Sequence, residues 1–76
     1  MNMLSGGIVE HLSNPDGPSA LVQITEPNGD VYTVRSLCRP DGTTEIGFPS
    51  PDIRHYLTER YGPQLSAVVR RTTVGF

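Results

Sequence analysis

The sequence predicts an α+β fold in which an antiparallel meander of four strands is followed by one helix packed on the sheet and by a last strand. Short segments rich in β-branched and apolar residues alternate with turn sequences containing proline, asparagine, aspartate and glycine. One segment, residues 50–62, instead shows helical spacing and has its own start and stop signals. The expected element order is therefore β-β-β-β-α-β.

Four strands are expected before the helix. Their ranges are 8–13, 20–26, 31–38 and 43–48. In the second strand Ala20, Val22 and Ile24 recur at every other position, which is the spacing of one face of a strand. Residues 1–7, which end in two glycines, are expected to be a flexible N-terminus of a single small domain spanning residues 1–76.

Two turn sequences predict tight hairpins between these strands. Residues 27–30, Pro-Asn-Gly-Asp, contain an Asn-Gly pair, which tolerates the positive φ angles of a tight hairpin turn. Residues 39–42, Arg-Pro-Asp-Gly, combine a proline that fixes φ with an Asp-Gly pair that closes the bend. Strands joined by such short turns lie antiparallel to one another.

The expected helix carries signals at both ends. Ser50 can cap the first turn, and Pro51 suits the first helical position because the N–H that proline lacks would have no partner there. Gly62 can close the helix in a left-handed conformation, and Pro63 prevents its continuation. The apolar side chains share one face: Ile53, Tyr56, Leu57 and Tyr61.

A last strand is expected over residues 65–76. The apolar run at its start predicts burial on both sides or a contact with another protein. With this strand in place, the element order resembles that of SH3-like small barrels, which carry a short helical turn before their last strand. The resemblance lies in element order, and it implies an alternative fold, a closed small barrel in which the last strand pairs with the first.

Composition limits how such a chain can be stabilised. With 76 residues it buries about 60% of the surface that its unfolded form exposes, so the core is small. Cys38 is the only cysteine, which excludes an internal disulfide, and no cysteine–histidine cluster offers a metal site. We therefore expect a homodimer or a bound partner, and neither cofactor nor metal.

The lone cysteine and the N-terminus predict a cytoplasmic protein. A single thiol is typical of a reducing compartment. No basic residue precedes the short apolar run of residues 1–11, so these residues do not form a secretory signal, and no apolar run reaches the ~20 residues that span a bilayer.

Charge is unevenly placed along the chain. Residues 1–50 hold six acidic and two basic side chains (−4), and residues 51–76 hold two acidic and four basic ones (+2), which gives −2 overall. All six Lys and Arg positions are arginine, the side chain better suited to forked contacts with carboxylates or phosphates. The acidic side chains of the first part are expected at the turn ends of the sheet: Asp16, Glu26, Asp30, Asp41 and Glu45.

Candidate catalytic groups are few. Cys38 stands beside Arg39, which can lower a thiol pKa, but no flanking signature ties a histidine base to it. His55 and Glu59 are four residues apart on the polar helix face, the spacing of an ordinary surface pair. We expect a structural role for all three, and therefore no enzymatic activity.

The sequence favours a small protein-interaction module that docks onto another protein, as phage or mobile-element modulators and inhibitors of larger machines do. The residues expected to bind the partner lie on the helix and on the last strand: Arg54, His55, Thr58, Glu59, Arg70 and Arg71. One alternative is a nucleic-acid-binding small barrel that stacks bases on Tyr32 or Tyr61, although the acidic net charge opposes it. A second alternative is a structural subunit without independent activity.

Overall fold

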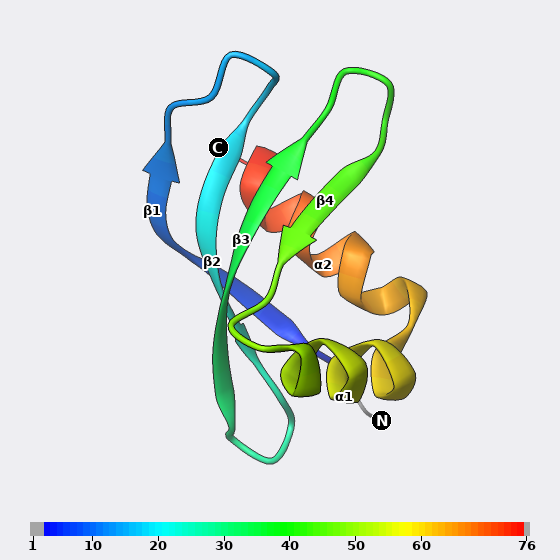
Figure 1. Ribbon diagram of the computed structural model, residues 1–76. Helices are drawn as coiled ribbons and strands as arrows, with labels where there is room; N and C mark the ends of the chain where they lie inside the picture. The colour runs from blue at the N-terminus through cyan, green and yellow to red at the C-terminus, as the bar shows by residue number, and fades with distance from the viewer. Residues whose placement is uncertain (1–2, 76) are drawn as a thin grey trace.

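The structure, a computed structural model, describes residues 3–75, which form a four-stranded antiparallel sheet followed by two helices (Figure 1). The strands neighbour one another in sequence order, so that the first and the last are the edges of the sheet. The elements are β1 (Ser5–Leu12), β2 (Ser19–Thr25), β3 (Val31–Cys38), β4 (Thr44–Gly47), α1 (Pro51–Tyr61) and α2 (Pro63–Val74). The predicted α+β class, an antiparallel meander with a helix packed on it, is confirmed.

The first strand begins earlier than we expected. β1 starts at Ser5, inside the segment predicted to be flexible. Leu4 just before it is buried, and its N–H donates to the side-chain carbonyl of Gln64 on α2 over 2.7 Å. Residues 1–2 of that segment lie outside the described residues. The chain is therefore tied to the fold from Leu4 onward, because burial and a backbone hydrogen bond act together there.

Both predicted hairpin turns are confirmed, and they share one geometry. The Gly29 N–H donates to Glu26 O over 2.9 Å, and the Gly42 N–H donates to Arg39 O over 3.0 Å. Each glycine has a φ of +95°, a conformation that residues with a Cβ rarely adopt. The Asn-Gly and Asp-Gly pairs therefore close these turns because each supplies a residue with positive φ.

The predicted helix is confirmed from end to end as α1. Ser50 Oγ accepts a hydrogen bond from the Ile53 N–H over 3.2 Å, which is the expected N-cap. Of the predicted apolar face, Leu57 and Tyr61 are buried and Ile53 packs against the core, but Tyr56 remains 36% exposed.

The segment after α1 is a second helix, and our expectation of a strand over residues 65–76 is wrong for its described part. The buried residues of α2 recur at the i, i+3, i+4, i+7 and i+8 spacing of one helical face: Leu65, Val68, Val69, Thr72 and Thr73. Valine and threonine favour strands only weakly, and burial along a common face overrides that preference. Residue 76 lies outside the described residues.

A single residue, Gly62, separates the two helices. Gly62 has a φ of +52°, which ends α1, and Pro63 occupies the first turn of α2. We had interpreted Pro63 only as a stop signal. Proline is equally suited to the start of a helix, because the N–H it lacks has no partner there.

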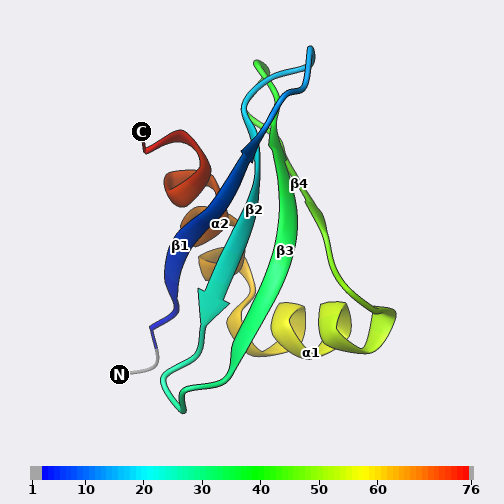
Figure 2. The same ribbon diagram turned by 90° about the vertical axis from the view of Figure 1, so that its left-hand side faces the viewer.

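The sheet is open, so the alternative of a closed small barrel is wrong. No strand follows β4 among the described residues, and β1 pairs only with β2 in the sheet. α2 lies against one face of the sheet, whereas α1 lies below the end of β4, beside the lower part of the β2–β3 hairpin (Figure 2). The face turned toward the viewer in Figure 1 carries no helix.

Small residues allow α2 to lie close to the sheet. A Cβ added at Gly6 of β1 would lie 2.3 Å from Thr72 Oγ1, so only glycine fits there without a shift. The hydroxyl oxygens of Ser36 on β3 and Thr73 on α2 share a hydrogen bond of 2.6 Å. The core combines buried apolar side chains from the sheet and both helices: Leu4, Ala20, Val22, Ile24, Val34, Leu57, Tyr61, Leu65, Val68 and Val69.

Candidate protein-docking surface

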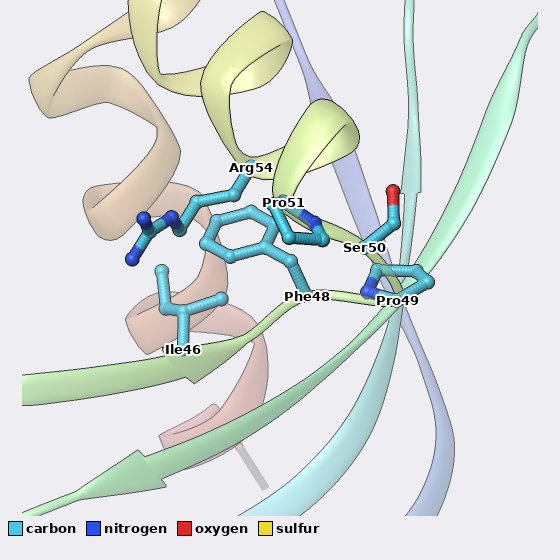
Figure 3. A pocket seen from close by; sticks show the side chains of 6 residues that line it. All are labelled: Ile46, Phe48, Pro49, Ser50, Pro51 and Arg54. Carbon is cyan, nitrogen blue, oxygen red and sulfur yellow. The ribbon is translucent and has the colours of Figure 1, made fainter.

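A pocket of about 390 Å³ opens where β4 ends and α1 begins (Figure 3). Ile46 and Phe48 form its apolar side, and both also pack against the core. Arg54, one turn into α1, extends its side chain toward Ile46. The remaining lining comes from the linker and the start of the helix: Pro49, Ser50 and Pro51. The pocket therefore joins an apolar surface to a single cation.

Local sequence explains why this pocket is held in shape. Pro49 ends the strand segment, and Pro51 fixes φ at the first position of α1. Ser50 between them is occupied by capping the helix, since its Oγ accepts from the Ile53 N–H. Because these residues are held in place, the pocket does not depend on a mobile loop, and Arg54 is its only charged lining residue.

The pocket continues onto the exposed face of α1. A second hollow of about 320 Å³ is lined by Arg54, His55 and Thr58, three of the residues predicted to bind a partner. All three are exposed. Within the described residues, no acidic side chain lies within 4.0 Å of the Arg54 guanidinium. The structure therefore brings these three predicted residues together around one unpaired cation.

The other predicted binding residues lie elsewhere. Glu59 is exposed one position beyond Thr58 on α1, but it lines neither hollow. Arg70 on α2 donates to Gly42 O and to Thr44 Oγ1, each over 3.2 Å, and so ties the helix to the β3–β4 turn. Arg71 is exposed on α2. Arg70 and Arg71 therefore belong to a different part of the surface from Arg54.

Glu26 is the residue whose position sequence reasoning missed. We expected it at an exposed turn, but it is only 3% exposed. Its carboxylate accepts hydrogen bonds from the Tyr61 hydroxyl and, over 3.0 Å, from the Tyr56 hydroxyl. Arg60 Nε lies 3.8 Å from the same carboxylate. The available signal was the strand alternation, because Glu26 continues the inward-facing series of Ala20, Val22 and Ile24.

The electrostatics of Glu26 favour its charged form. Burial on its own raises the pKa of the Glu26 carboxyl, but hydrogen bonds from Tyr61, Tyr56 and Tyr32, together with the charge of Arg60, outweigh burial. The net result is a pKa below the usual value. The pKa of Tyr61 is raised, first because its hydroxyl donates to Glu26 and then because of burial. Glu26 is thus a charged acceptor that holds α1 to the β2–β3 hairpin.

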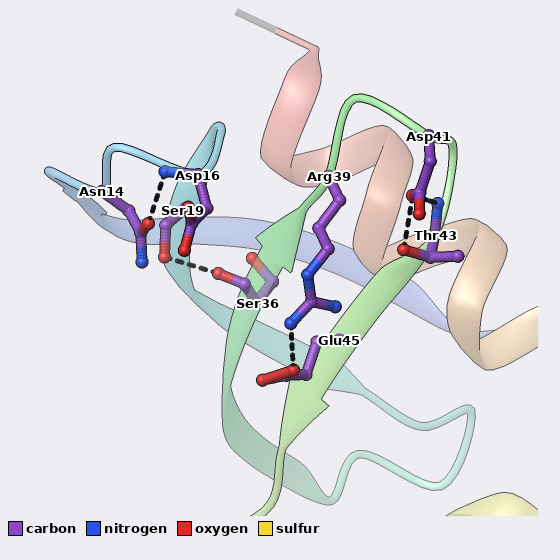
Figure 4. Close-up of polar contacts among 8 residues, drawn as sticks. All are labelled: Asn14, Asp16, Ser19, Ser36, Arg39, Asp41, Thr43 and Glu45. Atoms are coloured by element: carbon purple, nitrogen blue, oxygen red, sulfur yellow. Dashed lines mark hydrogen bonds and ion pairs between the residues drawn. The ribbon is translucent and has the colours of Figure 1, made fainter.

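Polar contacts at the opposite end of the sheet are also internal (Figure 4). Arg39 forms an ion pair with Glu45 across β3 and β4, and its pKa is raised chiefly by that contact. Asp41 accepts from the Thr43 hydroxyl and N–H, over 2.7 and 2.9 Å, and these bonds lower its pKa. These two acids serve the β3–β4 turn itself, so they do not form a free acidic surface.

Cys38, considered for catalysis, and Tyr61, considered for base stacking, are both buried. Cys38 is 2% exposed on the inner face of β3, so its thiol is turned away from solvent. Tyr61 is 8% exposed and its hydroxyl is bonded to Glu26, so it offers no stacking surface. Across residues 3–75, no three His, Cys, Asp or Glu side chains form a group suited to a metal ion.

Neither described helix is long and apolar enough to cross a membrane. No protein family matches this chain, and no curated protein or solved structure is significantly similar to it.

Proposed function

We propose that this chain is a small, non-enzymatic interaction module that docks onto another protein through the outward face of α1 and the adjoining β4–α1 pocket. One observation carries the proposal: Arg54, which has no acidic partner among the described residues, lines a pocket whose apolar side is formed by Ile46 and Phe48. An arginine held beside an apolar pocket, in contact with solvent, is a suitable anchor for a protein partner because arginine is enriched in interface hot spots.

The setting of the module is part of the same proposal. A core built from so short a chain is small, which favours a homodimer or a stable complex over an isolated monomer. The single reduced thiol of Cys38 favours the cytoplasm. We place the protein among small modulators or inhibitors that act by covering part of a larger protein.

Partner capture with matched variants tests the docking surface. Tagged wild-type protein is incubated with lysate of its host cells, and bound proteins are identified by mass spectrometry. Arg54→Glu is expected to remove the captured partner, since it reverses the only charge in the pocket, whereas Arg71→Glu on α2 is expected to retain it. Equal capture by both variants would place the contact on another surface.

Two further measurements separate the alternatives. Light scattering at two concentrations gives the assembly state, and a mass equal to one chain at both would remove the homodimer. Binding of a labelled oligonucleotide at low and high salt tests the nucleic-acid alternative, because phosphate contacts weaken steeply with salt. An interaction module is expected to show no such salt-dependent binding.

A further inference from the structure

The fourth strand presents a free backbone edge directly beside the pocket. β4 is the last strand of the sheet, and no other strand pairs with its outer edge, although α2 passes behind it and emerges on that side in Figure 1. Figure 2 shows the sheet edge-on, with β4 as its outermost strand. Arg39 N–H donates to Thr43 O over 2.9 Å, so the carbonyl of Thr43 faces β3, and Glu45, two residues on, pairs with Leu37 in the same register. Because backbone direction alternates along an antiparallel strand, the backbone groups of Thr44 and Ile46 face away from the sheet.

The pocket lies on the same side of the sheet as the Ile46 side chain, which lines it. Ile46 pairs with the buried Ser36, so both side chains point to the helix-covered face. A further strand added to β4 would place the residue opposite Ile46 on this same face. Its side chain would therefore enter the pocket, against Ile46 and Phe48.

The positive charge of Arg54 favours an added strand that carries a negative charge nearby. Residues two apart on a strand point to the same face and lie about 6.6 Å apart. A carboxylate two residues from the side chain in the pocket is thus in a position to meet the Arg54 guanidinium in a charge-assisted hydrogen bond. Asp52, in the same turn of α1, does not line the pocket and leaves this cation available.

We propose that the free edge of β4 binds an extended acidic segment of a partner protein, which adds antiparallel to the sheet, places an apolar side chain in the β4–α1 pocket and directs a carboxylate to Arg54. This inference rests on the proposed function and names the chemistry of its partner. It is a case of strand addition, in which backbone hydrogen bonds give affinity and alternate side chains give specificity.

The other edge of the sheet is less suited to the same role. The register of β1 against β2 shifts between Ile8 and Glu10, which marks a β-bulge at Val9. A bulge twists an edge strand away from regular pairing. The β4–α1 pocket, by contrast, combines the arginine Arg54 with the apolar residues Ile46 and Phe48, and it has no acidic lining residue.

Short peptides test the inference directly. The probe is a fluorescein-labelled nonapeptide with an amidated C-terminus, Ser-Thr-Glu-Thr-Leu-Thr-Glu-Thr-Ser, in which glutamates flank leucine at both i±2 positions. Fluorescence anisotropy is expected to show at least tenfold weaker binding when both glutamates are replaced by glutamine, when leucine is replaced by alanine, or when leucine is N-methylated. The last change removes the backbone donor that pairs with Ile46.

Protein variants and amide shifts locate the contact. Arg54→Gln is expected to weaken binding of the probe peptide at least fivefold, and Arg71→Gln is expected to leave its affinity unchanged. Amide resonances of Thr44 and Ile46 are expected to move most on titration. Equal binding of the glutamate and glutamine peptides, or the largest shifts on β1, would overturn the inference.

Two outcomes separate this inference from the proposed function. If no peptide binds but Arg54→Glu still abolishes partner capture, the surface docks a folded partner, and strand addition is wrong while the proposed function stands. If the Thr44 and Ile46 amides shift with protein concentration alone, the occupant is a second copy of this chain, and the acidic segment is wrong.

Discussion

The two helices are similar in length but are held by the molecule in different ways. α2 has 12 residues and buries one long face, from Leu65 to Thr73, against the sheet. α1 has 11 residues and buries only Leu57 and Tyr61. The first helix is anchored at a few points near the end of the sheet, whereas the second forms one layer of the core.

This difference indicates which part of the surface is free for another task. Substitutions at the buried positions of α2 disturb its packing on the sheet, because Val68 and Thr72 lie close to Gly6 of β1. Most of α1 contributes nothing to the core, so its exposed residues can vary with little effect on folding. We accordingly propose the docking surface on α1, and four pairs of substitutions test the contrast between the two helices.

Leu57→Ala breaks the main apolar anchor of α1 and should have the largest effect. Leu57 is fully buried, so its truncation is expected to lower the free energy of unfolding by about 2–5 kcal/mol. Urea denaturation followed by circular dichroism measures the loss. The neighbouring Thr58→Ala is exposed and should stay within about 0.5 kcal/mol of wild type. An unchanged midpoint for Leu57→Ala would mean that α1 is held by other contacts.

Gly6→Ala tests how tightly α2 lies on the sheet. The new methyl group would meet Thr72 Oγ1 at 2.3 Å, and overpacking of this kind is expected to cost about 1–3 kcal/mol. Gly7→Ala is a matched control, because a Cβ there meets nothing within 4 Å. Thermal unfolding compares the two, and equal melting temperatures would show that the helix does not pack against β1.

Glu26→Gln loosens α1 from the hairpin without emptying the core. Loss of a charged hydrogen-bond acceptor is expected to lower the free energy of unfolding by about 1–3 kcal/mol at pH 7. The folded-state pKa of Glu26 is lowered, so its stabilisation is complete above the unfolded pKa and is lost as pH falls through the folded pKa.

The melting temperatures of wild type and Glu26→Gln should therefore converge on acidification. Asp30→Asn, at the exposed end of the same turn, is the control and should leave the melting temperature at neutral pH unchanged. A gap between wild type and Glu26→Gln that persists at acid pH would mean that the charge of Glu26 is not what stabilises α1.

The smallest of the four expected effects is the difference in the free energy of unfolding between Arg70→Gln and Arg71→Gln. Arg70 donates to Gly42 O and Thr44 Oγ1, so its loss is expected to cost about 0.5–1.5 kcal/mol. Arg71 is exposed, and its replacement should change stability by less than about 0.5 kcal/mol. Matching denaturation curves would show that the contact between α2 and the β3–β4 turn contributes nothing.

Local signals predicted most of the fold. The turns at Asn28-Gly29 and Asp41-Gly42 and the cap at Ser50 depend on neighbouring residues, so the sequence alone predicts them. The second helix was missed because Val68, Val69, Thr72 and Thr73 favour a strand individually, whereas their helical spacing acquires meaning only when a sheet covers that face.

The candidate site was predictable only in part. Arg54, His55 and Thr58 were expected on the exposed side of α1, and the structure places them around one hollow. The pocket beside them depends on how β4 meets α1 in space, which no spacing in the chain encodes. Strand alternation could have placed Glu26 on the inner face, but its tyrosine partners lie 30 and 35 residues away in sequence, so only the fold identifies them.

The joint at Gly62 makes the relative direction of the two helices depend on a single residue. Its φ of +52° and ψ of −127° are accessible to glycine and strained for other residues. An inserted residue would rotate one helix by about 100° relative to the other. This rotation would remove Leu57 from the core or turn Arg54 away from Ile46. In directed evolution, length changes should thus be tolerated in the hairpin loops and rejected between the helices.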